Sequence, residues 1–342
     1  MLKHACGFAL WMAATLAPAA DAVPMAAETS VAEANAPARP GWSAASRSSG
    51  QPTARHESAA AVVDGELFVI GGRGQPPLDI LDLATGEWRQ GAAAPMEIHH
   101  TQAAVLDGRI YVIGALTGPW PQEEVVPRVL IYDPESDRWQ EGPELPADRR
   151  RGGGGLVVHE GVFYLVGGNR LGHRAGFVPW LDAFDPKTGT WTALPDAPHA
   201  RDHFHAAVLD GKIYAVGGRL SGHEDGGQMG LHLDGMDVYD VAARRWTTAA
   251  QAIPTPRSGV SVVVLDGRIV VLGGESERQE RAHAEVEAYD PRSQTWTSLP
   301  AMPVGRHGMQ AVVAGDAIHV VAGSGNRGGG PELNDHWVLG AL

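Results

Sequence analysis

The feature that most constrains the fold of this chain is a repeat of about 50 residues. Each repeat contains an apolar run that ends in two small residues, as in Glu66–Gly72 (ELFVIGG). The first small residue of each pair falls at positions 71, 114, 167, 217, 273 and 322, which are 43 to 56 residues apart. Tryptophans recur separately at positions 42, 88, 139, 191, 246 and 296, with spacings of 46 to 55 residues. Two independent markers with the same period indicate an array of similar structural units.

Each unit is predicted to form four short β-strands, a to d. An apolar run such as Ala206–Leu209 forms strand a, and a pair such as Asp210-Gly211 turns the chain into strand b. Glycine suits this turn because it accepts the positive φ that a tight hairpin needs. Strand b ends in the small pair, where a missing side chain lets neighbouring backbone approach. Strand c ends in an aromatic-Asp-Pro corner such as Tyr132-Asp133-Pro134, and the tryptophan marks strand d.

Together, the glycine pair, the aromatic-Asp-Pro corner and the spaced tryptophan resemble the kelch repeat. The resemblance runs from about Trp42 to Leu339 and implies an all-β, six-bladed β-propeller with one four-stranded blade per repeat. The pattern departs from the family locally. Leu81-Asp82-Leu83 replaces the corner in the first unit, and the second and sixth units have Gly-Ala and Ala-Gly instead of the glycine pair.

The two ends of the repeat region predict how the ring closes. The sixth unit has strands a and b, and Asn334–Leu339 fits strand c, but no strand d follows. An unpaired strand d lies instead at the N-terminal end, around Trp42. We therefore expect the N-terminal strand to complete the last blade, which also covers edges that would otherwise pair with other chains.

The segment before the repeats is expected to be a leader and a linker. Met1–His4 is weakly positive, Ala5–Leu16 is apolar, and small-x-small cleavage patterns follow, which predicts a signal peptide over residues 1–22. The apolar run is shorter than the roughly 20 residues that a membrane span needs. Residues 23–41, rich in Ala, Pro and Glu, are predicted to be a disordered linker to the propeller at 42–342. The protein is accordingly expected in the periplasm or outside the cell.

Charge and cysteine usage exclude several classes of function. The net charge of −13 argues against nucleic acid as a partner, because phosphate binding favours a basic face. The only cysteine is Cys6, inside the predicted signal peptide, so the mature chain would have no disulfide, cysteine ligand or cysteine nucleophile. The copper radical chemistry of kelch-containing galactose oxidases needs a cysteine cross-linked to tyrosine, and it is excluded on the same ground.

Strand alternation predicts which face carries function. The loop that enters strand a and the loop from b to c lie on one face of a propeller, and the a–b and c–d turns lie on the other. The long insertions, such as Leu116–Arg128 and Asn169–Trp180, all fall in b–c loops. Long loops on a rigid scaffold usually carry function, so the site is predicted on this loop-rich face.

Arginine recurs in the entry loops of this face. The position nine residues before each a–b turn is occupied, in order, by Arg55, Ile98, Arg151, Arg201, Arg257 and Arg306. One interpretation is structural: the arginines brace neighbouring blades through backbone carbonyls. The other is a ring of guanidinium groups that binds carboxylates in a two-pronged manner. The kelch resemblance favours ligand binding on this face, where arginines of kelch domains contact acidic groups.

Histidines cluster directly after these positions. His56, His99 and His307 follow at matching positions of three units, and His100 and His203 lie one residue further on. All five are predicted to bind a ligand, together with the arginines. Three histidines can form a metal site, but matching positions on adjacent blades are expected to lie too far apart to share one ion. No metal or other cofactor is therefore predicted.

The function that these patterns favour is binding of a carbohydrate, an acidic small molecule or a protein partner. Trp120 and Trp180, on long loops, could stack on a sugar or could simply cover the mouth. The alternative is a sugar mutarotase or epimerase. The chain resembles the periplasmic kelch enzyme N-acetylneuraminate epimerase in its signal peptide, blade count and arginine-rich face. Such an enzyme needs an acid–base pair; Glu57, Glu123, Glu124 and Glu224 are candidates, but no motif marks them.

Overall fold

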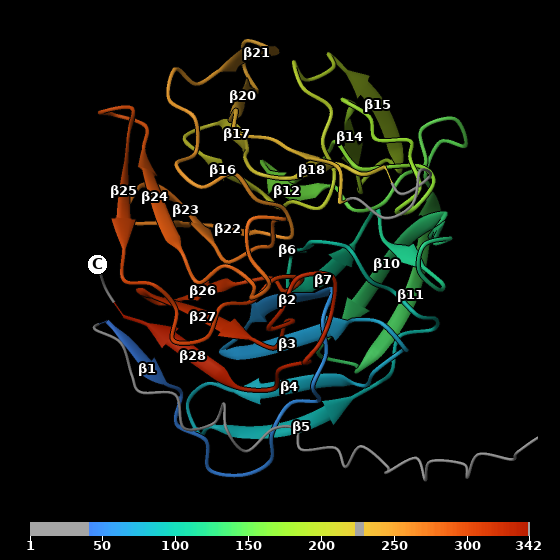
Figure 1. The fold of residues 1–342 in the computed structure, drawn as a ribbon. Helices are drawn as coiled ribbons and strands as arrows, with labels where there is room; N and C mark the ends of the chain where they lie inside the picture. Colours follow the sequence, from blue (N-terminus) through green and yellow to red (C-terminus); the bar gives the residue numbers. More distant parts are fainter. Residues whose placement is uncertain (1–40, 223–228, 341–342) are drawn as a thin grey trace, which may run out of the picture.

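The computed structural model describes residues 41–222 and 229–340 (Figure 1). The predicted signal peptide, the linker up to residue 40, and His223, Glu224 and Asp225 lie outside the described residues. All regular structure in the described part is β, arranged as six four-stranded sheets and two two-stranded ribbons. In these residues we find no helix with the length and apolarity needed to cross a membrane. The predicted all-β, six-bladed propeller is confirmed.

Each four-stranded sheet is one blade, and its strands follow one another from the channel to the rim. Blades 1 to 3 are β2 (Ser58–Val63), β3 (Glu66–Gly71), β4 (Leu78–Asp82), β5 (Glu87–Gly91); β6 (Ala103–Leu106), β7 (Arg109–Val112), β10 (Arg128–Asp133), β11 (Arg138–Glu144); and β12 (Gly155–His159), β13 (Val162–Val166), β14 (Leu181–Asp185), β15 (Thr190–Leu194). Blades 4 to 6 are β16 (Ala206–Leu209), β17 (Lys212–Ala215), β20 (Asp237–Asp240), β21 (Arg245–Thr248); β22 (Ser261–Leu265), β23 (Arg268–Leu272), β24 (Val286–Asp290), β25 (Thr295–Leu299); and β26 (Val312–Ala314), β27 (Ala317–Val321), β28 (His336–Leu339), β1 (Trp42–Ala44). The ribbons β8 (Leu116–Thr117)–β9 (Glu124–Val125) and β18 (Arg219–Leu220)–β19 (Leu231–His232) lie in b–c loops.

The N-terminal strand closes the ring as predicted. β1 pairs antiparallel with β28, with Trp42 opposite Leu339, so the first strand of the fold is the outer strand of the last blade (Figure 1). Trp42 is 3% exposed, and its indole N–H donates to the carbonyl of Pro300 in blade 5 at 2.7 Å. One tryptophan thus joins the start of the propeller to both of the last two blades.

The repeated residues have direct structural roles. In blade 2, Tyr132 and Trp139 lie opposite each other on strands c and d, with ring centroids 5.2 Å apart. Blades 3, 4 and 5 repeat this aromatic pair at 4.7 to 5.2 Å. Gly71, the first of a glycine pair, has φ +65°, and a Cβ there would lie 2.2 Å from the carbonyl oxygen of Ile98 in the next blade. The small pair is therefore the point where neighbouring blades meet backbone to backbone.

Candidate functional site

Six residues, one from each blade, form a closed ring of backbone hydrogen bonds where the chain enters the inner strands. They are Glu57, His100, Gly153, His203, Gly259 and Gly308. His100 N–H donates to the Glu57 carbonyl at 3.1 Å, and each following residue donates in turn to the one before it, at 2.6 to 3.2 Å. The N–H of Ser58 donates to Gly308 at 3.1 Å and closes the circle. We call these six residues the axial ring.

Three positions of the axial ring carry side chains in a conformation that suits glycine. The three ring glycines have φ of 62 to 69°, whereas Glu57, His100 and His203 have φ of 58°, 50° and 54°. A residue with a Cβ in this left-handed region costs roughly 1–2 kcal/mol. Strained residues of this kind cluster at functional sites. The axial ring therefore singles out Glu57, His100 and His203 from the periodic scaffold.

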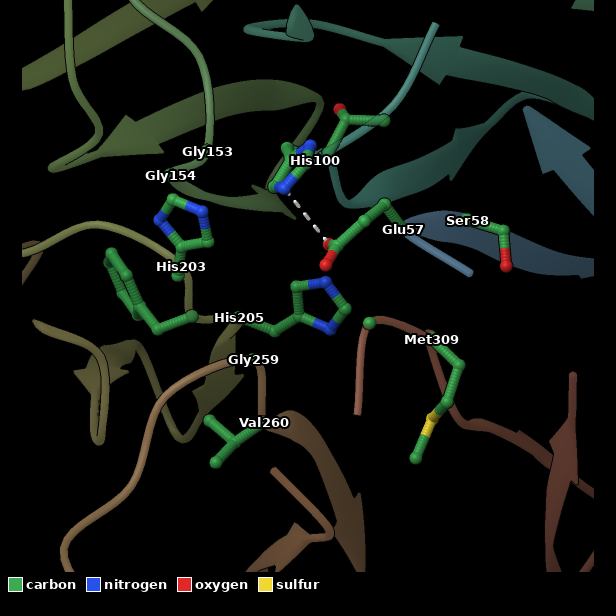
Figure 2. A pocket seen from close by; sticks show the side chains of 13 residues that line it. Glu57, Ser58, His100, Gly153, Gly154, His203, His205, Gly259, Val260 and Met309 are labelled. Atoms are coloured by element: carbon green, nitrogen blue, oxygen red, sulfur yellow. Dashed lines mark ion pairs between the residues drawn. The ribbon is translucent and has the colours of Figure 1, made fainter. Parts of the chain in front are cut away.

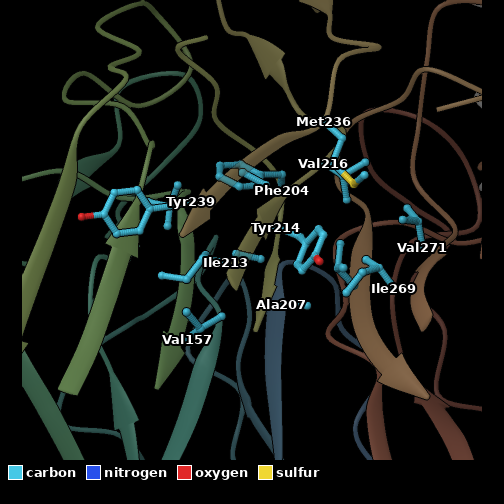
Figure 3. Close-up of a cluster of buried hydrophobic side chains, with 14 of the residues drawn as sticks. Val157, Phe204, Ala207, Ile213, Tyr214, Val216, Met236, Tyr239, Ile269 and Val271 are labelled. Carbon is cyan, nitrogen blue, oxygen red and sulfur yellow. The ribbon is translucent and has the colours of Figure 1, made fainter. Parts of the chain in front are cut away.

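The core holds these residues in place. Phe204, next to His203, is 2% exposed and packs in a hydrophobic cluster with Val216 and Met236, between blades 3 and 5 (Figure 3). The anchored phenylalanine fixes the strand entry, so the preceding histidine projects toward the channel. Figure 2 shows His100, His203 and His205 converging on the same small pocket, with the Glu57 carboxylate beside His100.

A large cavity opens on the loop-rich face above this pocket. Its volume is about 950 Å³, and both entry loops and b–c loops line it, as the sequence predicted for this face. The lining includes His56, Glu57, Arg73, His100, Trp120, His173, Arg219, Glu275 and His307. Glu57 and His100 also line the smaller pocket of Figure 2. They lie at the throat between the mouth and the channel.

His100, His173 and His203 meet at this throat. One ring nitrogen from each lies within 4.8 Å of the other two, and all three residues are buried. The Nε2 atoms of His173 and His203 are 3.0 Å apart. The His100 ring centroid lies 4.9 Å from both of the other centroids. We call these three residues the histidine cluster.

The remaining ring nitrogens of the cluster contact groups that orient them. His203 Nδ1 is hydrogen-bonded to the buried carboxylate of Asp202. Asp202 in turn accepts from the Ser221 hydroxyl at 2.5 Å and the Ser221 N–H at 3.1 Å. His173 Nδ1 lies 2.8 Å from the carboxylate of Glu123, which also accepts from Arg73 at 2.6 Å. Each of these two rings is therefore oriented by a carboxyl group, and each carboxyl group is oriented in turn by its own hydrogen bonds.

His100 is oriented by a second histidine. His99 Nε2 lies 3.1 Å from the carbonyl of Gly118, and its Nδ1 lies 2.7 Å from Nδ1 of His100. Since the carbonyl can only accept, His99 donates to it through Nε2 and accepts at Nδ1. His100 therefore donates through Nδ1 and presents a lone pair at Nε2. That Nε2 makes no hydrogen bond within the described residues, although Glu57 Oε2 lies 3.3 Å away.

Burial decides the charge of these groups. Desolvation lowers the pKa of His99 to about 4 and brings the pKa of His100 well below its ordinary value. Both rings are neutral at pH 7. Glu123 behaves in the opposite way: burial would raise its pKa, but His173 and Arg73 stabilise the carboxylate and lower the pKa to about 2. Asp202 differs from Glu123, because burial raises its pKa despite the lowering effects of Arg219 and Ser221.

The expected separation concerned matching positions on adjacent blades, and His100 and His203 do not lie on adjacent blades. These residues belong to blades 2 and 4, and their ring centroids are 4.9 Å apart. The axial ring position of blade 3, between them, is Gly153. With no side chain there, the two imidazoles meet across the gap.

The other predicted histidines lie near the cluster but outside it. His99 is the orienting group described above. His56 and His307 line the mouth, where His56 Nδ1 lies 2.7 Å from Glu332. His307 lies 3.7 Å from Glu57 and 3.5 Å from Glu275.

The five arginines predicted to bind a ligand are structural. Arg55, Arg151, Arg201, Arg257 and Arg306 are at most 1% exposed. Each donates to the carbonyl of the first residue of the small pair in its own blade. Each also pairs with an acidic residue just before or at the start of strand c: Asp79, Asp182, Asp237, Glu287 and Asp335, in that order. The interpretation of a guanidinium ring for carboxylate ligands is therefore wrong, because a ligand cannot reach these groups.

Sequence reasoning missed His173 as a site residue. It lies in the loop between β13 and β14, which was singled out only for its length. Glu123, a possible acid or base in the sequence, is instead the buried partner of His173 and Arg73. A lone histidine on an irregular loop has no periodic marker, so only the folded chain brings it to the axial ring.

The buried carboxylate of Glu275 on this face makes contacts that we expect to be lost in acid. It accepts from Arg219 at 2.7 Å and from the Gly328 N–H at 2.7 Å. Burial raises its pKa, but His307 and Arg219 outweigh burial and lower it to about 2, against an ordinary 4.5. Its stabilisation is thus complete above about pH 4.5 and is lost as the pH falls toward 2. Urea unfolding at several pH values measures this loss, and we expect Glu275→Gln to make the unfolding free energy fall less steeply over this range. Glu280→Gln, at an exposed position, should leave the slope unchanged. Equal slopes in both variants would contradict the assignment.

Comparison with known proteins gives a consistent family match. The family described as "KLHDC2/KLHL20/DRC7 Kelch-repeats domain" matches residues 37–218 and, overlapping, 181–325. Kelch-like protein terF of Aspergillus terreus is 30% identical over 290 residues, covering 79% of this chain and 61% of the relative. Human Kelch-like protein 23 is 26% identical over 290 residues, covering 81% of this chain and 48% of the relative. The chain thus spans less than two thirds of either relative.

A solved structure supports the same architecture. The structure described as "Structure of YjhT" superposes with a TM-score of 0.68, covering 85% of this chain and 96% of that one. The two sequences are 17% identical, so this likeness bears on the fold alone.

Proposed function

This chain belongs to the kelch-repeat β-propeller family, and from that premise we propose that it binds a small hydroxylated or acidic molecule, such as a sugar or sugar acid, in the cavity of its loop-rich face. Membership of the family supports a binding role, because kelch propellers commonly bind partners. The volume and the lining of the cavity favour a small molecule over a protein as the ligand.

The observation that carries this proposal is the cavity of about 950 Å³ at the channel mouth. Small-molecule sites are concave and have volumes of roughly 300–1,000 Å³, whereas protein partners use broader surfaces. Acidic and basic side chains line the same cavity, so hydroxyl groups of a ligand would find both donors and acceptors. Trp120, 58% exposed on the lining, offers an aromatic platform for a sugar ring.

Sugar mutarotation is the second candidate, and one contact favours it. Glu57 Oε2 lies 3.3 Å from His100 Nε2 at the cavity floor, which places a carboxylate and an imidazole together where a ligand would rest. Such a pair could move a proton to and from a sugar hydroxyl. Of the other acids considered, Glu123 is buried in ion pairs, and Glu224 lies outside the described residues.

We also propose that the protein is exported. The support is the leader pattern of residues 1–22, with its apolar run and small-x-small sites.

Replacement of Trp120 tests the binding proposal. A panel of monosaccharides and sugar acids is screened by thermal shift and calorimetry. We expect at least one to bind and Trp120→Ala to weaken it by about 0.5–1.5 kcal/mol, the range of a lost aromatic contact. Phe177→Ala is the matched control, since Phe177 is exposed but does not line the cavity.

Binding that both variants retain would move the site elsewhere, and a panel without any binder would contradict the small-molecule proposal. For the second candidate, exchange NMR on anomers of the bound sugar measures the mutarotation rate. Glu57→Gln is expected to remove any catalysed rate, because an amide cannot take up and return the proton. No rate above that of buffer would exclude mutarotation.

A further inference from the structure

The histidine cluster has the arrangement of a metal-binding site. Its three rings come from three separate segments: the β6 entry, the β13–β14 loop and the β16 entry. Their convergence is therefore not a by-product of one local turn. Two of the three, His100 and His203, occupy left-handed positions of the axial ring that glycine fills in blades 3, 5 and 6.

The partners of the cluster contact every ring at its Nδ1 edge. His173 Nδ1 lies against Glu123, and His203 Nδ1 lies against Asp202. The Nδ1 edge of each of these two rings is thus engaged with a buried carboxyl group. The contact with His99 assigns the Nδ1 proton to His100. The Nε2 atoms of His173 and His203 face each other at 3.0 Å, and one ring nitrogen of His100 lies within 4.8 Å of the nitrogens of both.

A buried group of three imidazoles is suited to a cation. Metal-bound histidines almost always donate their second ring N–H to a carboxylate or another acceptor, which fixes the tautomer and makes the ring more basic. Here every ring has such a partner, and the carboxylates of Asp202 and Glu123 are held by further hydrogen bonds.

From this arrangement we propose that His100, His173 and His203 together bind one divalent transition-metal ion through their Nε2 atoms. Imidazole suits zinc, copper, iron and nickel, and three histidines with an open fourth position are typical of a catalytic zinc site. At metal–nitrogen distances of about 2.0–2.1 Å, tetrahedral ligand nitrogens lie about 3.3 Å apart. The observed pair at 3.0 Å is close to this spacing, and an inward shift of His100, whose nitrogen lies within 4.8 Å of the other two, would complete the triangle.

The open position faces the cavity. His100 and His173 line both the site and the mouth, so a ligand oxygen or a water molecule can complete the coordination from that side. Glu57, 3.3 Å from His100 Nε2, is placed to accept a hydrogen bond from such a water. The ion would thus be a Lewis acid at the floor of the binding cavity. Metal binding itself does not depend on which organic ligand enters.

Titration of the tag-free, chelator-stripped chain with Co²⁺ and Zn²⁺, followed by absorbance and calorimetry, tests the proposal. We expect one equivalent to bind, with the visible spectrum of tetrahedral Co²⁺. His173→Gln and His203→Asn should each weaken binding at least about 100-fold, and Asp202→Asn about 10- to 100-fold. His205→Gln is the matched control, because His205 lines the pocket of Figure 2 but lies outside the cluster.

Each outcome decides the question. No saturable binding, or binding that His173→Gln leaves unchanged, would overturn the proposal. His173 lies on a loop, so its variant should keep the blades intact, as circular dichroism would verify. The titration contains no sugar. Its result is therefore separate from the sugar-binding test, and either proposal can fail alone.

Discussion

Arg257→Met is expected to destabilise the propeller by about 3–5 kcal/mol, the cost of removing one partner from a buried ion pair. Arg257 is 0% exposed, and its guanidinium pairs with Glu287, which is 3% exposed. It also donates to the backbone carbonyls of Thr255 and Gly273. The variant would leave a buried carboxylate and buried carbonyls without these donors. Urea unfolding followed by tryptophan fluorescence measures the loss.

Two further variants distinguish the effect of losing the ion pair from nonspecific destabilisation. Arg257→Met combined with Glu287→Met should recover much of the stability, because an apolar pair of similar volume removes the uncompensated charge. Arg245→Met, at an exposed position of β21, should change stability by less than about 0.5 kcal/mol. If Arg257→Met costs no more than Arg245→Met, the bracing role is wrong.

Trp42→Ala is expected to cost about 3–5 kcal/mol, the range for truncating a buried tryptophan. The indole fills the core between blades 5 and 6, and its N–H bond to Pro300 would be lost with it. Because β1 is the outer strand of the last blade, the loss also weakens the closure of the ring. Thermal unfolding by far-UV circular dichroism measures the change without relying on tryptophan emission.

Ser43→Ala provides the control on the same strand, where the side chain is exposed. It should leave the midpoint nearly unchanged. A Trp42→Ala variant as stable as Ser43→Ala would show that the N-terminal strand does not hold the ring closed.

The fold was predictable because its markers are periodic. The Trp spacing, the glycine pairs and the corner residues each recur for a packing reason, so the blade count and the closure by the Trp42 strand followed from the sequence alone. The acid partners of the arginines recur as well, at Asp79 and its counterparts. Without this series of acidic residues, the periodic arginines could be interpreted either as structural braces or as groups that bind a ligand.

The candidate site was less predictable, because its residues are those that depart from the repeat. His100 and His203 could be found as departures, and the face that carries them was identified from loop lengths. His173 could not, because its contribution depends on the path of one irregular loop. The meeting of His100 and His203, on blades that are not adjacent, depends on the space that Gly153 leaves between them. Side chains that converge on a propeller axis are neighbours across blades, whatever their separation in sequence.

The central claim is that the histidine cluster at the throat of the propeller is a metal site. Anomalous X-ray scattering at the zinc edge, from crystals of the tag-free chain grown with Zn²⁺, tests it most directly. We predict one strong peak within bonding distance of the Nε2 atoms of His100, His173 and His203. A peak at other histidines with none at the cluster, or no peak, would contradict the claim.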